Sequence, residues 1–401
     1  MPRNRFLVFS VSIMAIAMVL AAIHNSPAQN VGAYEVTNII GSSGAPIKDS
    51  HMINAWGNAF FPDNPFWIND EGTGVSELID GNGTIFSALP LVTVPGAKGG
   101  TGQPTGIVAN ETADFAISGG PALFIFDTED GTVSAWNESL GSTAVIEVNN
   151  GGTKKYTGLA LANNGTANLL YAANEGVGKN PAGSIDVFDT NFSPTTTTGG
   201  FVDPKLPAHF VPYNIQALNG NLYVAYAKGL QAVGRVDEFD PNGNFIMAFT
   251  SKTLAEPWGL VIAPANFGPF SNDLLVGNLA NGTISAFNPT SGEFLGQLAN
   301  SKSKRIVVPG LWSLVNGTAL NANPDAIYFT AGPMGYRAGL LGSIAVAPAP
   351  TPKPTKTPKP TKTPKPTRTP DGTATPTTVP TATTSGDPSP SATPTMITYP
   401  Y

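Results

Sequence analysis

The sequence predicts an all-β protein, a six-bladed β-propeller closed by an N-terminal strand and followed by a disordered tail rich in Pro, Thr and Lys. Three observations predict this fold. A short phrase recurs six times along the chain, and each copy holds three or four apolar runs separated by Gly, Asn, Asp and Pro turns. No stretch shows sustained helical periodicity. One strand-like run before the first copy belongs to none of the six.

The recurring phrase is clearest in the stretch that begins Glu256-Pro257-Trp258-Gly259 and continues through LVIAP, LLVGN and GTISAF. Equivalent turns place the residue matching Gly259 at positions 57, 106, 158, 214, 259 and 313, so the repeat length varies from 45 to 56 residues. Units of this length with several strands favour a radial array of four-stranded sheets. The alternative, a parallel β-helix, has much shorter repeats.

The ring is expected to close through the chain's N-terminal part. The sixth unit ends at GSIAVAP and lacks an outer strand, whereas Tyr34–Ile40 (YEVTNII) precedes the first unit without a sheet of its own. Pairing this run with the last unit would leave no free strand edge. The predicted propeller therefore spans residues 30–349.

Residues 1–28 have the pattern of an export signal. Arg3 and Arg5 precede the apolar run Phe6–Ile23, and Ser26-Pro27-Ala28 offers small residues for cleavage. The alternative is an uncleaved membrane anchor, because the run is about long enough to span a bilayer. The sequence therefore predicts an exported protein, extracellular or at the cell surface, with membrane contact only through this segment if it is not cleaved.

Residues 350–401 form a low-complexity tail with Pro at every second or third position and regularly spaced Lys in its first half. Such a sequence extends as polyproline II and builds no packed core. We expect a linker or stalk, in keeping with display at a surface.

Composition narrows the function classes. The chain has no cysteine, which excludes disulfides, thiol catalysis and thiolate metal sites. Between Asn30 and Pro350 there are 13 basic and 25 acidic residues. This acidic balance disfavours nucleic acid as a partner. We expect a monomer.

Several phrases carry a resemblance to a known family, among them FWINDEGTG (66–74), FIFDTEDGTVSAWN (124–137) and GTISAFNPTSGEFLG (282–296). Over roughly residues 34–347 the chain resembles a family of secreted bacterial propellers of no established function, some of which carry PEP-CTERM-type surface sorting signals. More loosely, its units are similar to NHL-type repeats and to lactonase-like six-bladed propellers. The Thr-Pro-Lys tail departs from the family pattern, because it stands where a sorting signal would be.

Binding sites of propellers usually lie on the face where two sets of loops open over the central channel, here called the top face. The loops that lead into each first strand carry Trp56, Thr105, Tyr156, Tyr213, Trp258 and Trp312. The loops between second and third strands carry Asn69, Asp70, Glu71, Glu129, Asp130, Asn174, Glu175, Lys228, Asn278, Tyr336 and Arg337. These residues predict either an aromatic collar for a sugar, polyol or cationic ligand, or aromatic rings that only pack adjacent blades together.

Catalytic patterns are sparse. His24 lies in the predicted signal, and His51 and His209 are isolated in the sequence, which disfavours a histidine triad or a zinc site. The sequence predicts no cofactor, with Ca²⁺ as the one alternative. Four loop carboxylates would be its ligands if they converge on the channel mouth instead of lying in solvent. They are Asp70, Glu129, Asp130 and Glu175.

Together these patterns favour an exported, non-enzymatic propeller, displayed at or released from the cell surface, that binds a glycan or protein partner through its top face. The alternative is a Ca²⁺-dependent hydrolase or lyase of the lactonase-like kind, with the four carboxylates at the central channel.

Overall fold

The computed structural model describes residues 29–348 except 88, 90, 180, 230 and 319–321, and the side chains of residues 29–32 are also not described. The predicted signal segment (1–28) and the predicted tail (350–401) lie outside the described residues. Within the described part, no helix combines the length and the apolar character needed to cross a membrane.

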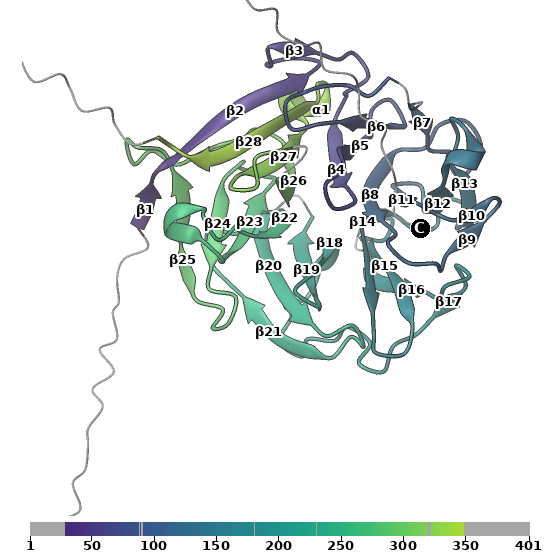
Figure 1. The fold of residues 1–401 in the computed structure, drawn as a ribbon. Coiled ribbons are helices and arrows are strands. Elements are labelled where there is room, and N and C mark those ends of the chain that lie inside the picture. Colours follow the sequence, from purple (N-terminus) through teal and green to yellow (C-terminus); the bar gives the residue numbers. More distant parts are fainter. Residues whose placement is uncertain are drawn as a thin grey trace, which may run out of the picture.

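Six sheets surround a common axis, as the sequence predicts (Figure 1). Blade 1 contains β4 (Ala55–Ala59), β5 (Phe66–Asp70), β6 (Val75–Ile79) and β7 (Val92–Thr93). Blade 2 contains β8 (Pro104–Ala109), β11 (Phe124–Thr128), β12 (Thr132–Trp136) and β13 (Val145–Asn149). Blade 3 contains β14 (Tyr156–Asn163), β15 (Asn168–Asn174), β16 (Ser184–Phe188) and β17 (Pro194–Thr195).

The second half of the ring has the same plan. Blade 4 contains β18 (Val211–Leu218), β19 (Asn221–Lys228), β20 (Gln231–Phe239) and β21 (Phe245–Phe249). Blade 5 contains β22 (Pro257–Ile262), β23 (Leu274–Asn278), β24 (Ile284–Phe287) and β25 (Phe294–Ala299). Blade 6 contains β26 (Leu311–Asn316), β27 (Ile327–Ala331) and β28 (Leu340–Val346). The first strand of each blade contacts the first strands of both neighbours, and β26 contacts β4, so the ring is closed.

The predicted closing strand is confirmed. Strand β2 (Tyr34–Gly41) pairs antiparallel with β28 and supplies the outer strand of blade 6. The Tyr34 hydroxyl, fully buried, donates to the carbonyl of Phe267 at 2.8 Å and accepts from the amide of Phe270 at 3.2 Å. The chain's N-terminal part therefore fastens blade 6, which is built mainly from its C-terminal part.

Some short elements were not predicted from the sequence. Strand β1 (Gln29–Gly32) pairs parallel with β25 as a fifth strand of blade 5, and β3 (Ile47–Lys48) pairs parallel with β2. The connections also contain the hairpin β9 (Ala116–Ile117) and β10 (Gly120–Pro121), the 3₁₀ turns η1 (Glu138–Leu140) and η2 (Gly268–Phe270), and the single-turn helix α1 (Pro333–Tyr336).

The core lies between the blades. Strand β11 is buried at every residue, because each face of its sheet packs against a neighbouring blade. Strand β13, an outer strand, alternates instead between exposed and half-buried residues. The difference explains why the second strands read as continuous apolar runs in the sequence.

Each first strand has a β-bulge near its beginning, for example between Pro257 and Leu260. Close approach of neighbouring blades accompanies the bulge. A Cβ on Gly57 would lie 2.2 Å from the carbonyl oxygen of Thr105, and one on Gly106 would lie 2.5 Å from the amide nitrogen of Leu159. The repeated glycine is therefore required by the distance between first strands.

Candidate functional site

The predicted aromatic collar is a compact plug. Trp56 and Trp312 stack with ring centroids 3.6 Å apart, and Trp258 meets both rings edge-on at 6.4 and 5.9 Å. Tyr213 packs beside Trp312 at 6.2 Å. The three tryptophans, here called the tryptophan plug, are at most 4% exposed. They come from blades 1, 5 and 6 and pack on one another, so they hold blades together and offer no open collar.

Hydrogen bonds fix the plug to both sides of the ring. The Trp258 indole donates to the carbonyl of Thr157 in blade 3 at 2.7 Å, and the Trp312 indole donates to Asn54 Oδ1 at 2.8 Å. The Trp258 carbonyl in turn accepts from Asn214 Nδ2 at 2.7 Å. The plug therefore links blades that are distant in sequence.

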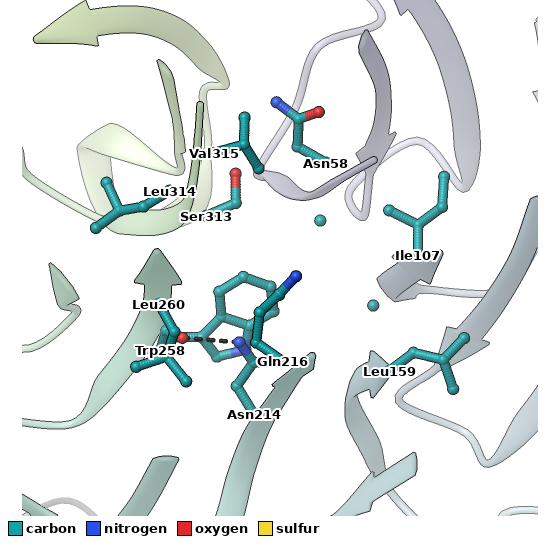
Figure 2. A pocket seen from close by; sticks show the side chains of 12 residues that line it. Asn58, Ile107, Leu159, Asn214, Gln216, Trp258, Leu260, Ser313, Leu314 and Val315 are labelled. Carbon is teal, nitrogen blue, oxygen red and sulfur yellow. Dashed lines mark hydrogen bonds between the residues drawn. The ribbon is translucent and has the colours of Figure 1, made fainter. Parts of the chain in front are cut away.

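A hollow of only about 10 Å³ lies among the first strands. Figure 2 shows the side chains around it, including Asn58, Ile107, Leu159 and Gln216 from four different blades. A space of this size is at the lower limit for one water molecule. The described channel therefore has no room for a ligand at this level.

Tyr156 does not belong to the plug. In blade 3 Tyr156 pairs with Asn174 at the start of the bulge, and in blade 5 Pro257 pairs with Asn278 in the same way. Tyr156 is therefore equivalent to Pro257. The residue equivalent to Trp258 is Thr157, as the alignment of Gly158 with Gly259 implies, so the assignment of Tyr156 to the collar was wrong by one residue. The Tyr156 ring packs between blades 2 and 3.

Above the plug, blades 1 to 3 carry a continuous polar rim. Glu71, Glu129 and Glu175 occupy equivalent loop positions, since their amides bond to the carbonyls of the residues that lead into the first strands, Asn54, Gln103 and Lys155 respectively. Side chains of the same residues bridge the glutamates. Asn54 and Gln103 donate to Glu71 at 2.8 and 2.6 Å, and Lys155 Nζ lies 3.1 Å from Glu129 and 2.9 Å from Glu175. Each glutamate of this rim thus has a partner within it, although the three carboxylates have a single cation, Lys155.

Blades 5 and 6 differ, because Leu279 and Gly332 take the positions of the rim glutamates. A cavity of about 320 Å³ opens here. Its lining consists of Leu279–Gly282, Val307, Pro309, Gly310 and Gly332–Tyr336. Tyr336 is 46% exposed and lies 5.7 Å from the Trp312 ring. The top face is thus polar on one side of the plug and hollowed and apolar on the other.

The loop beside this cavity is strained. Met334, Gly335 and Tyr336 have φ values of 60°, 66° and 65°, so two non-glycine residues adopt the left-handed conformation. The Arg337 side chain is exposed and donates to the Met334 carbonyl at 3.2 Å. Backbone strain of this kind clusters at ligand-binding sites.

Tyr213 is buried near several negatively charged side chains. Burial, together with the negative charges of Glu175 and Glu256, raises the pKa of the Tyr213 hydroxyl well above its usual value. Burial also raises the pKa of Glu256, which lies between the rim and the cavity. The top face is therefore acidic around a neutral phenol.

Three predicted amides serve the structure. Asn69 Nδ2 donates to the carbonyls of Thr105 and Gly106, Asn174 Oδ1 accepts from the amide of Lys155, and Asn278 Oδ1 accepts from the amide of Ala255. All three are buried. Lys228 ends β19 and is half-buried. None of the four lines the cavity.

The four carboxylates predicted for Ca²⁺ do not converge. Glu129 and Glu175 share Lys155, and Asp130 accepts from the amide of Ala97 at 2.7 Å and from Thr128 at 2.6 Å. Asp70 is fully buried elsewhere, and burial beside Glu77 raises its pKa well above the usual range. No three of the four lie within 4.8 Å of one another. The four carboxylates lie in equivalent loops of the sequence repeat, but the fold holds them apart.

His51 is not isolated, contrary to the sequence-based expectation. Its imidazole Nδ1 lies 3.2 Å from Asp49 Oδ1, and its Nδ1 or Nε2 lies near a carboxylate oxygen of Glu77. The spacing Asp49-Ser50-His51 was a signal for the first contact. The contact with Glu77 required the fold.

Comparisons with known proteins give the family. No protein-family model matches the chain. A protein of Acanthamoeba polyphaga mimivirus, described as "Uncharacterized protein R648", is 32% identical over 324 residues, which are 75% of this chain and 76% of the viral protein. The chain belongs to the same family as R648. A second member from that virus, "Uncharacterized protein L690", is 30% identical over 79% of this chain and 87% of its own length. These family members are viral, whereas the sequence suggested a bacterial family.

Solved structures with a similar arrangement are more distant. One is described as "glucose dehydrogenase", with 11% identity, a TM-score of 0.47, and coverage of 78% of this chain and 100% of that chain. Another is the aldose sugar dehydrogenase of Streptomyces coelicolor in its PQQ-bound form, with 12% identity, a TM-score of 0.47, and coverage of 79% and 99%. Likenesses at this distance say nothing about function, so the site must be interpreted from its own geometry.

Proposed function

We propose that this protein is an exported binding protein that holds a glycan on its top face, in the cavity between blades 5 and 6. The observation that carries the proposal is the cavity of about 320 Å³ beside the strained, exposed loop Met334–Tyr336. Small-ligand sites usually have volumes of about 300–1,000 Å³. The cavity therefore suits a single sugar unit, with further units on the open surface.

The lining has the two kinds of group that sugars need. The half-exposed Tyr336 ring offers a flat apolar wall for the C–H face of a sugar ring. The Asn281 side chain and the chain around Gly310 and Gly332 supply polar groups at the other walls. Burial, together with the negative charge of Glu256, raises the pKa of the Tyr336 hydroxyl, so the phenol beside the cavity stays neutral.

Binding is favoured over catalysis because the charged rim groups are engaged with one another. Lys155 sits between Glu129 and Glu175, and Glu71 accepts two amide hydrogen bonds. General acid–base chemistry needs a proton-transfer group aimed at a substrate. Export and display are part of the proposal and rest on the sequence of residues 1–28 and 350–401.

A glycan-array screen of the full-length chain tests the proposal, followed by titration calorimetry with the best glycan. We expect Tyr336→Asn to lower the affinity at least about tenfold, or about 1.4 kcal/mol, because a central aromatic contact is lost. Asparagine tolerates the positive φ at this position, so the loop conformation should persist. The matched control is Ile246→Asn, which removes an apolar side chain of similar exposure from the outer strand of blade 4.

Two results would contradict the proposal. One is the lack of any glycan binding by the wild-type chain. The other is a Tyr336→Asn variant that binds as well as Ile246→Asn. Capture of a protein partner through the same residues would replace the glycan with a protein ligand.

A further inference from the structure

A cluster of ionisable side chains lies at the seam, meaning the interface between blades 6 and 1. Asp70 ends β5 and Glu77 lies on β6, on the face of blade 1 that packs against blade 6. Asp49 and His51 come from the segment between the closing strand β2 and the first strand β4. The cluster therefore joins the N-terminal segment to the body of blade 1, and none of its four members lines the cavity.

The three outer members are close enough to share one ion. A carboxylate oxygen of Asp49, an imidazole nitrogen of His51 and a carboxylate oxygen of Glu77 all lie within 4.8 Å of one another. Asp49 Oδ1 also accepts the His51 amide at 2.8 Å, which fixes the turn between the two residues. Asp70 lies directly behind Glu77 and interacts with it.

The carboxylates of this cluster are buried and lack donors. Asp70, Glu77 and Asp49 are 0%, 1% and 6% exposed. Neither oxygen of Asp70 or Glu77, and not Oδ2 of Asp49, accepts a hydrogen bond from the described residues. Buried carboxylates are normally paired with a cation or bound to a metal, because their desolvation is costly. These oxygens point at one another and at His51.

Equivalent positions in other blades show what is missing. Glu77 lies on the third strand of blade 1. Asp186 in blade 3 and Asp237 in blade 4 have the same position on their third strands, as judged by pairing with the second strand. Asp186 has Lys154 Nζ at 3.2 Å and the Tyr156 hydroxyl at 3.0 Å, and Asp237 has Arg235 Nε at 2.6 Å. The chain supplies a cation at both of these positions. It supplies none to Glu77 within the described residues.

We propose that Asp49, His51 and Glu77, with Asp70 behind them, bind one divalent metal ion that fastens the seam of the propeller. The donor set is mixed, with carboxylate oxygens and one imidazole nitrogen. Ca²⁺ takes oxygen ligands, whereas imidazole favours first-row transition ions. The cluster therefore fits a first-row transition metal ion. His51, with 54% of its side chain exposed, leaves a path to the solvent. The inference does not depend on the proposed glycan function.

The first experiment uses the full-length protein after dialysis against EDTA. Titration calorimetry with MnCl₂, ZnCl₂ and CaCl₂ should show one ion per chain, with tighter binding of Mn²⁺ or Zn²⁺ than of Ca²⁺. The same ion should raise the Tm, because a ligand that binds only the folded state stabilises it. Tightest binding of Ca²⁺ would overturn the assignment to a transition ion.

Variants decide whether these residues are the ligands. His51→Asn should weaken binding at least tenfold, and Glu77→Gln should abolish it. The matched control His209→Asn removes the other histidine of the described chain and should leave binding unchanged. Because His51 is at the surface, its variant keeps the test valid if Glu77→Gln does not fold.

Three outcomes would overturn the proposal. One is the lack of one-to-one binding at millimolar ion. Another is equal binding by wild type and His51→Asn. The last is a pair of results: wild type binds no metal, and Glu77→Gln is more stable than wild type. A proton shared between Asp70 and Glu77 would then explain the cluster.

Discussion

The interface between blades 3 and 4 and the seam between blades 6 and 1 bury an acid at the same position of the third strand, but with different partners. Asp237 in blade 4 contacts Arg235, which also contacts Asp203 from the connection between the two blades. Among the described residues, the ionisable groups beside Glu77 in blade 1 are other carboxylates and His51. The repeat determines where the acid lies, whereas its partner differs from blade to blade: Arg235 lies on the same strand as Asp237, and His51 comes from the connection before blade 1.

The interface between blades 2 and 3 buries a further acid, on the second strand of blade 2. Asp127 is fully buried and accepts from the Thr105 hydroxyl at 2.6 Å and from the Gly106 amide at 2.5 Å. Its hydrogen-bond donors are neutral groups, whereas Asp237 contacts the charged Arg235. The three interfaces predict three different responses to mutation.

The largest effect is expected at the seam when residues 30–40 are deleted. The deletion removes β1 and most of β2, and with them Tyr34, Ile39 and Ile40, whose burial contributes about 5–9 kcal/mol. We expect the Tm to fall by about 10 °C or more in scanning calorimetry. Deletion of residues 352–362 in the tail is the control of equal length. A Tm that both deletions leave unchanged would show that β2 does not hold the ring closed.

The next effect is expected for Arg235→Met between blades 3 and 4. It leaves Asp237 and Asp203 buried without a cation, which costs about 3–5 kcal/mol. Urea unfolding measures the loss, and Arg305→Met, an exposed site, should cost less than about 0.5 kcal/mol. Adding Asp237→Asn should recover part of the stability. Equal losses at both arginines would remove the contrast between the interfaces.

The smallest effect concerns pH at Asp127. Burial raises the pKa of this carboxyl from 3.8 to about 6, against the lowering effect of Thr105 and Gly106. Between pH 4 and 6 the folded chain holds this proton while the unfolded chain has released it. The contribution of Asp127 to the free energy of unfolding therefore falls by about 3 kcal/mol as the pH rises through this window, and stays constant above it.

Urea unfolding of wild type and Asp127→Asn at pH 4, 5, 6 and 7 measures this contribution. The stability of the variant relative to wild type should rise from pH 4 to 6 and then level off. A difference that does not change with pH would contradict the raised pKa of Asp127.

The fold was largely predictable because its signals are local and repeated. Turns rich in Gly and Asn, apolar runs of strand length and six equivalent turn positions, four of them glycine, predict six sheets, and the run at Tyr34–Ile40 predicts the closing strand. The choice of collar residues was less exact than the alignment. In blade 3 the aromatic Tyr156 was chosen in place of Thr157, the residue that precedes the aligned Gly158, although a one-residue shift turns a side chain to the opposite face of a strand.

The sequence by itself determined which side chains approach the channel, but only the tertiary structure decided what they do there. Trp56, Trp258 and Trp312 fill the mouth because ring closure brings blades 5, 6 and 1 together, and aromatic rings at that distance pack on one another. Likewise, Asp49 and Glu77 meet only after the N-terminal segment crosses the seam. Contacts between residues distant in sequence depend on closure of the ring, and no local pattern records them.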